Sequence, residues 1–114
     1  MFQKQLQSKV IIFSLFSLFF GSISLNVVAD ISPQRQQELS YMVRQDCGSC
    51  HGMTLKGGLG PALLTERLAK FPKQYLIDTI KYGRPGTAMP PWLPILTEEE
   101  IQWIVTWLLK LGNK

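Results

Sequence analysis

The sequence predicts an all-α fold, and three observations support this. Apolar residues recur every three or four positions in several segments, as the buried face of a helix requires. No segment alternates apolar and polar residues with the period of two that a half-buried strand shows. Four prolines, at positions 85, 90, 91 and 94, exclude a long helix or a central strand from residues 84–96. We therefore expect about four or five short helices joined by loops.

The first 29 residues have the layout of an export signal. Lys4 and Lys9 precede an apolar run over residues 10–20, and small or polar residues follow it. The run is shorter than the ~20 residues needed to cross a bilayer, and Ala29 ends a natural cleavage site. We expect residues 1–29 to be a signal peptide that is removed on export.

Residues 30–114 are expected to form one domain, because they contain no internal repeat and no change of composition, and the signal predicts that this domain is exported. The domain would touch a membrane only if the signal stayed uncleaved as an anchor, the alternative that the apolar residues near Val28 leave open. Loss of the two signal lysines brings the formal charge of +4 close to neutrality. Lys and Arg are scattered and form no basic stripe, so we expect no nucleic-acid binding, and we expect a monomer.

The first helix of the domain is expected to begin at Pro33. Ser32 can cap it, and proline suits the first helical position because its missing N–H would have no partner there. Leu39, Met42 and Val43 mark one apolar face. We expect this helix to run into the first cysteine.

The middle of the chain is expected to hold a loop and two short helices. Residues 51–60 are rich in glycine and have no apolar period, which indicates a loop that wraps around something. No strand precedes these glycines and their spacing matches no phosphate-binding motif. Short helices are expected over residues 61–70 and from Pro72 to Gly83. The inner face of the second would consist of Tyr75, Leu76, Thr79 and Ile80.

The last helix has the clearest start signal. Thr97 can cap it while Glu100, three residues on, reaches back to the amide of the cap. Three consecutive glutamates also suit the positive end of the helix dipole. The helix is expected to end at Gly112. Its buried stripe, flanked by Trp103 and Trp107, would be formed by Ile101, Ile104, Val105, Leu108 and Leu111.

The strongest chemical signal is the segment Cys47-Gly48-Ser49-Cys50-His51. On one helical turn two thiols can reach the two vinyl groups of a haem while the adjacent imidazole reaches the iron, and Cys-x-x-Cys-His is the recognised attachment signature. The chain has no other cysteine or histidine. The sequence therefore predicts one covalently attached haem c per chain, with His51 as an iron ligand.

Other roles for Cys47 and Cys50 each require a feature that the sequence does not offer. A structural zinc site needs four ligands, and the chain offers three in this motif. A thiol–disulfide enzyme places its Cys-x-x-Cys after a strand, whereas a capped helix leads into Cys47. A disulfide between the two cysteines would close so short a loop that it would constrain the unfolded chain little.

A second axial ligand is expected from a methionine, the usual choice when the reduction potential is high. Met42 lies on the helix that presents His51, and Met53 is too close to His51 to circle a porphyrin. Met89 has the reach, and the proline that follows it lowers the entropy cost of holding a weak thioether ligand. His51 itself needs its second ring nitrogen held, for which a carbonyl near Gly60-Pro61 is the expected acceptor.

Four motifs resemble, in the same order, those of the class I cytochromes c. They are Cys47-Gly48-Ser49-Cys50-His51, Gly60-Pro61, Met89-Pro90 and Trp107-Leu108. The resemblance implies a small class I cytochrome c fold, in which Pro61 supplies the carbonyl for the histidine and Met89 binds the iron.

This resemblance also implies that the first and last helices cross near Leu39, Val43 and Trp107. Leu39 stands where the family often has a small residue, a departure that concerns the closeness of the helix contact and not the fold.

Residues 46–64 and 82–92 further resemble the NirC-type cytochromes, which accompany the cytochrome cd-type nitrite reductases of denitrifiers. This implies a periplasmic redox protein that delivers electrons to nitrite reductase or serves the maturation of its d-type haem.

We expect an electron carrier and not an enzyme. An exposed haem edge near Lys56, Arg84 and Trp92 would be the docking patch, although Trp92 packing against the haem is the stronger interpretation of that residue. Two alternatives stay open. One is a haem enzyme or gas sensor in which Met89 is displaced, and the other is a maturation factor whose main role is to bind partners.

Overall fold

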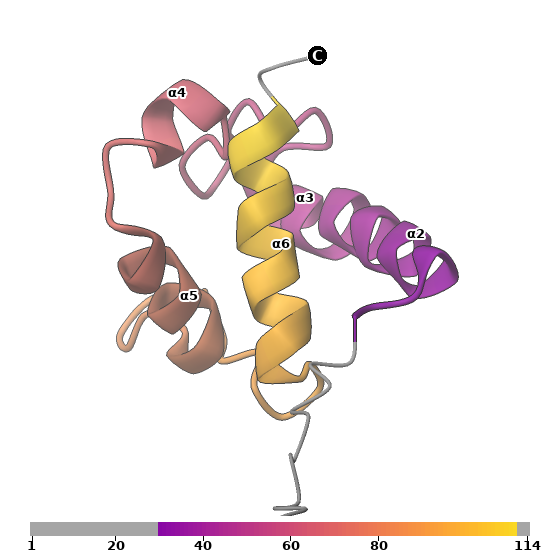
Figure 1. Ribbon diagram of the computed structural model, residues 1–114. Helices are drawn as coiled ribbons and strands as arrows, with labels where there is room; N and C mark the ends of the chain where they lie inside the picture. The colour runs from indigo at the N-terminus through magenta and orange to yellow at the C-terminus, as the bar shows by residue number, and fades with distance from the viewer. Residues whose placement is uncertain (1–29, 112–114) are drawn as a thin grey trace, which may run out of the picture.

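The computed structural model describes residues 30–111. The expected signal peptide (residues 1–29) and Gly112 lie outside the described residues. Within this part of the chain the structure contains helices and loops and no strand, which confirms the all-α prediction (Figure 1). The elements are α2 (Pro33–Met42), a π-helical turn (Val43–Cys47), α3 (Gly48–His51), α4 (Thr65–Leu68), α5 (Lys73–Tyr82) and α6 (Glu98–Lys110).

Helix α2, the π-helical turn and α3 form one continuous helical stretch. Ser32 caps its start, accepting a hydrogen bond from the Arg35 amide at 3.3 Å. In the π-helical turn the Gly48 amide donates to the carbonyl of Val43, five residues back, so the helix widens by one residue before α3 begins. The stretch ends at Gly52, whose φ of 87° an L side chain would resist. The first helix therefore does run into Cys47, as predicted.

Helix α6 occupies the middle of the fold, with α2 on one side and α5 on the other (Figure 1). Four side chains are almost completely buried: Leu39, Val43, Ile101 and Val105. Helices α2 and α6 contact each other as predicted, and Leu39 is fully enclosed at 0% exposure. The predicted stripe of α6 is buried at Ile101, Ile104, Val105 and Leu108, while Leu111 is only partly buried.

Polar contacts fix the orientation of α6. The capping box is present, because the Glu100 amide donates to Thr97 Oγ1 at 3.2 Å and the Thr97 amide donates to Glu100 Oε2 at 2.9 Å. Glu100 also accepts from Arg35 Nε at 2.6 Å, which links α2 to α6 and holds the pKa of the Glu100 carboxyl below its usual range. The Arg44 guanidinium lies 5.5 Å from the centre of the Trp107 ring.

The helix predicted over residues 61–70 is shorter than expected, because α4 covers only Thr65–Leu68. In residues 61–63 the backbone instead forms hydrogen bonds with groups outside the helix. The Leu63 amide donates to the carbonyl of Leu55 at 2.9 Å, and the carbonyl of Pro61 is bonded to a side chain described below. Leu64 is extended, with φ −78° and ψ 143°, so α4 begins only at Thr65.

Helix α5 begins after Pro72 and ends at Gly83, as predicted. Ile77 belongs to the hydrophobic core, Leu76 and Ile80 pack against it, and Lys81 is also buried. The four residues predicted for its inner face turn toward a cavity: Tyr75, Leu76, Thr79 and Ile80.

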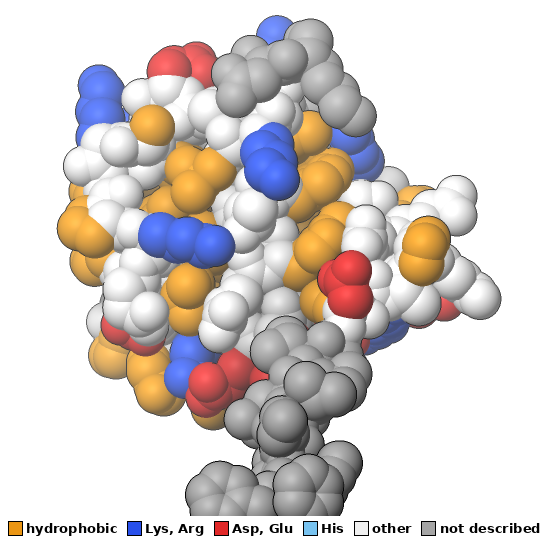
Figure 2. Space-filling view, in the orientation of Figure 1, with side chains coloured by type: hydrophobic (Ala, Val, Ile, Leu, Met, Phe, Trp, Pro, Cys, Tyr) orange, Lys and Arg blue, Asp and Glu red, His pale blue; other side chains and the backbone are white. Residues whose placement is uncertain are grey.

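Figure 2 shows Lys and Arg side chains scattered over one face between patches of apolar side chains. Within residues 30–111 no helix combines the length and the apolar character that crossing a bilayer requires.

Candidate functional site

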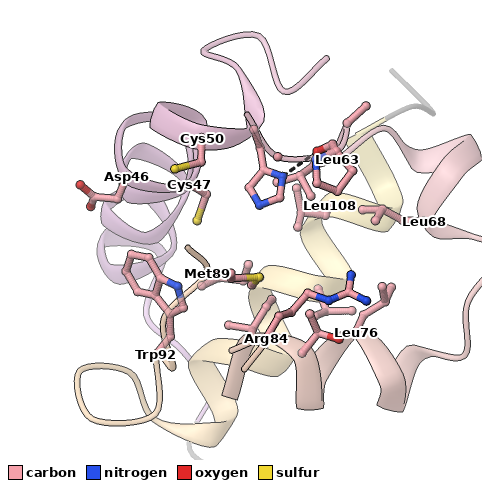
Figure 3. A pocket seen from close by; sticks show the side chains of 18 of the residues that line it. Asp46, Cys47, Cys50, Leu63, Leu68, Leu76, Arg84, Met89, Trp92 and Leu108 are labelled. Carbon is pink, nitrogen blue, oxygen red and sulfur yellow. Dashed lines mark hydrogen bonds between the residues drawn. The ribbon is translucent and has the colours of Figure 1, made fainter. Parts of the chain in front are cut away.

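A cavity of about 520 Å³ lies between the helical stretch that ends in α3, helices α4, α5 and α6, and the loops before α4 and after α5 (Figure 3). All five site residues proposed from the sequence line this cavity: Cys47, Cys50, His51, Pro61 and Met89. They come from three segments that are far apart in the chain. The fold therefore brings the separate motifs of the sequence to a single site.

Both cysteines are free thiols, and Figure 3 shows their sulfur atoms on the same side of the cavity. Burial raises the pKa of Cys47 to about 11, and the negative charge of Asp46 adds to the effect. The Cys47 thiol is therefore uncharged at neutral pH. A thiol that catalyses disulfide exchange has the opposite property, a lowered pKa that yields the reactive thiolate.

The described residues contain no cluster of three His, Cys, Asp or Glu side chains that could hold a metal ion. Cys47, Cys50 and His51 share the cavity wall without converging on one point as zinc ligands do. Their arrangement suits a larger group that the three side chains contact at separate atoms.

The hydrogen bond expected for His51 is present. Its Nδ1 lies 2.6 Å from the carbonyl oxygen of Pro61, which can only accept, so Nδ1 carries the proton. In a neutral imidazole the other nitrogen, Nε2, then keeps a free lone pair, as a metal ligand must. The Gly60 amide donates to the Cys50 carbonyl and the Gly57 amide to that of His51, both at 2.8 Å. The glycine-rich loop is thereby folded back over the end of α3.

Gly60→Ala is expected to displace the His51 ring, because a Cβ at position 60 would lie 2.9 Å from ring atoms Nδ1 and Cε1. Overpacking of this kind costs about 1–3 kcal/mol, which denaturant unfolding would measure. Gly48→Ala is the matched control, since its Cβ would lie 3.4 Å from the nearest atom, an ordinary contact on helical backbone. Equal stability of the two variants would contradict this account of Gly60.

Met89 projects into the cavity from the loop between α5 and α6, on the opposite side from the helix that carries the cysteines (Figure 3). Its carbonyl accepts from the Arg84 amide at 3.1 Å, and its amide donates to Thr87 Oγ1 at 3.3 Å. Gly83 packs so closely on this turn that a Cβ would lie 2.6 Å from the Met89 carbonyl oxygen. The backbone of Met89 is therefore held on both sides.

The other two methionines weighed as ligands are placed differently. Met42 also lines the cavity, but it lies on α2, in the same helical stretch as the cysteines. Met53 is 56% exposed and is not part of the cavity wall.

The remaining walls are mostly apolar. Trp92 is half-buried and lines the cavity, in agreement with a packing role, whereas Lys56 is exposed and lies outside it. Two arginines complete the lining, Arg67 and Arg84, and Arg84 Nη2 donates to the Tyr75 hydroxyl at 3.1 Å. Arg67 was not singled out from the sequence, because no motif distinguishes it from other surface arginines. The apolar walls include Leu68, Leu76, Ile80, Leu96, Ile104, Val105 and Leu108.

These features fit a haem. Apolar walls suit the porphyrin, two thiols on one helical turn suit its vinyl groups, and two guanidinium groups suit its anionic propionates. An all-helical fold that places a Cys-x-x-Cys-His helix on such a cavity, with a methionine across from it, defines a c-type cytochrome.

The comparison with known families also identifies a c-type cytochrome. The family described as "Cytochrome C oxidase, cbb3-type, subunit III" matches residues 34–108, and the chain belongs to this family of c-type cytochrome domains. Members of the cytochrome c class carry covalently bound haem c and generally transfer electrons.

More specifically, the chain is similar to proteins named cytochrome c55X and NirC. It is 49% identical over 86 residues to "Cytochrome c55X" of Stutzerimonas stutzeri, covering 75% of this chain and 76% of that relative. Its fold matches the structure of "c-type cytochrome NirC" with a TM-score of 0.68 at 45% identity, over 70% of this chain and 94% of the other. The chain is therefore a monohaem c-type cytochrome related to NirC.

A further similarity is to one part of a larger protein, "Dihydro-heme d1 dehydrogenase NirN in complex with DHE". The TM-score is 0.57 at 33% identity, over 61% of this chain but only 15% of the other.

Proposed function

We propose that this protein is a periplasmic carrier of single electrons. The observation that supports the proposal is the convergence of Cys47, Cys50, His51 and Met89 on one apolar cavity. In this proposal the two cysteines hold one haem c through thioether bonds, and His51 Nε2 and Met89 Sδ are its axial ligands. Once bound, the haem supplies an iron that cycles between the ferric and ferrous states.

The chain's own residues would determine how that cycle proceeds. Pro61 fixes the tautomer and the orientation of His51, and the hydrogen bonds of Met89 fix the backbone behind its sulfur. Two protein ligands that stay in place in both redox states leave little to rearrange during electron transfer. They also leave no position for a substrate, which is why we propose a carrier and not an enzyme.

The proposed location and partners rest on the relatives. Cleavage after Ala29 would release the domain into the periplasm, where covalent haem attachment of this kind takes place. Similarity to proteins named NirC and cytochrome c55X supports a role beside a cytochrome cd-type nitrite reductase in denitrification. The exposed rim of the cavity near Arg84 would be the docking patch in these encounters.

A redox titration of the holoprotein, followed by its optical spectrum, tests the carrier proposal. We expect a single reversible one-electron step, and no change in the spectrum of the reduced protein when carbon monoxide is added, because both axial positions are filled. Rapid binding of carbon monoxide by the reduced protein would contradict the proposal and favour an enzyme or gas sensor with a displaceable Met89.

A role in the maturation of d-type haem is the second candidate, and one observation favours it. The chain resembles a domain of a protein whose name, dihydro-heme d1 dehydrogenase, describes chemistry on such a haem. Stopped-flow measurements separate the two candidates. One follows electron transfer from the reduced protein to purified nitrite reductase, and the other follows electron transfer to the oxidised protein from a purified dihydro-haem dehydrogenase loaded with its dihydro-haem substrate. The faster reaction identifies the partner.

A further inference from the structure

The loop that carries Met89 has two stems, and one ion pair joins them. The loop leaves α5 after Tyr82 and enters α6 at Glu98. Lys81, in the last turn of α5, places its Nζ 2.6 Å from Oε1 of Glu98, the first residue of α6. We call this contact the stem pair. It closes the base of the loop at the two points where the loop meets regular structure.

The burial of Lys81 sets it apart. It is the one buried charged residue among residues 30–111, and its side chain is 11% exposed, against 56% for Glu98. A lysine this enclosed lowers stability unless its charge is paired. The hydrogen bond to Glu98 supplies that partner and raises the pKa of Lys81 above its ordinary value. Glu98 therefore balances the charge of Lys81, and the Tyr82 ring, whose centre lies 5.2 Å from Nζ, adds a cation–π contact.

The backbone at Lys81 is also tied to the loop itself. The Lys81 carbonyl accepts from the Leu93 amide at 3.3 Å, and the Ile80 carbonyl accepts from the Trp92 amide at 3.0 Å. The returning half of the loop thus rests on the last turn of α5, in the same turn that the stem pair anchors to α6. Movement of this turn would be passed directly to the segment that holds Met89.

We propose that Lys81 is a positioning residue for Met89. Through the stem pair it keeps the two ends of the loop together and so holds the thioether toward the cavity. Holding the two ends of a loop together costs conformational entropy. The stem pair offsets part of this cost, and so favours the loop conformations in which the Met89 sulfur points into the cavity. The proposal rests on the proposed function, in which Met89 is an iron ligand.

Competition by imidazole in the ferric holoprotein tests the stem pair. Imidazole displaces a methionine from the iron, and the loss of the weak far-red band of sulfur-ligated ferric haem reports the displacement. Lys81→Leu and Glu98→Gln are each expected to raise the affinity for imidazole about threefold, as the loss of a partly exposed ion pair would. Because both remove the charge pairing of the same contact, the double variant is expected to gain little more than either single variant.

Arg35→Gln is the matched control. It breaks the Arg35–Glu100 pair, which has the same length of 2.6 Å but ties the start of α6 to α2 and not to α5, together with the Arg35–Glu38 pair within α2. We expect this variant to unfold at lower denaturant concentration while its affinity for imidazole stays at the parent value.

Three outcomes would contradict either the positioning role of the stem pair or the iron ligation by Met89 on which that role depends. Parent-like imidazole affinity in both Lys81→Leu and Glu98→Gln would overturn the positioning role, and so would an equal rise in Arg35→Gln. Glu98→Gln, at an exposed position, keeps the test decisive if Lys81→Leu fails to fold. Absence of the far-red band in the parent protein would instead overturn the ligation by Met89, and the stem pair with it.

Discussion

A variant in which alanine replaces both Cys47 and Cys50 is expected to lose its covalent haem and most of its cooperative folding. The core residues of α6 border the haem cavity, so the haem would complete the core. Without the haem, the apolar walls of a cavity of about 520 Å³ would face water, and the hydrophobic stabilisation of burying them would be lost. A small domain has a total stability of only ~5–15 kcal/mol, so this loss is expected to abolish cooperative unfolding.

Extraction with acidified organic solvent and circular dichroism would measure both effects. Ser49→Ala is the matched control, because Ser49 lies between the two cysteines, is exposed, and donates its hydroxyl only to the Asp46 carbonyl and weakly to Cys50. It is expected to keep its haem and its helical signal. A double cysteine variant that retained haem through extraction would contradict the proposed attachment.

Met89→Ala is expected to open the sixth coordination position of the iron. The far-red band of the oxidised protein should disappear, and carbon monoxide should bind the reduced protein. The reduction potential should fall by on the order of 0.1–0.3 V, part of the ~0.8 V range that axial ligands set.

Two other methionines provide the controls for this experiment. Met53→Ala, at a position that is 56% exposed and outside the cavity wall, should keep the parent spectrum. Met42→Ala removes a residue that does line the cavity, but from the helix on the cysteine side. If Met42→Ala abolished the band and Met89→Ala did not, our choice of ligand would be wrong.

Local signals in the sequence predict much of this fold. The start of α6 follows from Thr97 and Glu100, because a capping box needs only residues three apart. The ends of α5 follow in the same way from Pro72 and Gly83. The His51–Pro61 hydrogen bond was also predictable, since an imidazole that binds metal needs a partner for its second nitrogen.

Features that depend on distant contacts could not be predicted in this way. The late start of α4 goes with the extended Leu64 and with the hydrogen bond between Leu63 and Leu55, and no local pattern predicts that pairing. No residue type or spacing in the sequence marks the π-helical turn before α3. The burial of Lys81 depends on the packing of α5 against α6, so in sequence it reads as an ordinary lysine in the last turn of a helix.

The intact mass of the exported protein, produced with a competent cytochrome assembly system, tests the central claim most directly. We predict the mass of a chain that begins at Asp30 plus exactly one haem, in a red protein whose two cysteines do not react with thiol reagents. A colourless, folded protein with two reactive thiols would contradict it.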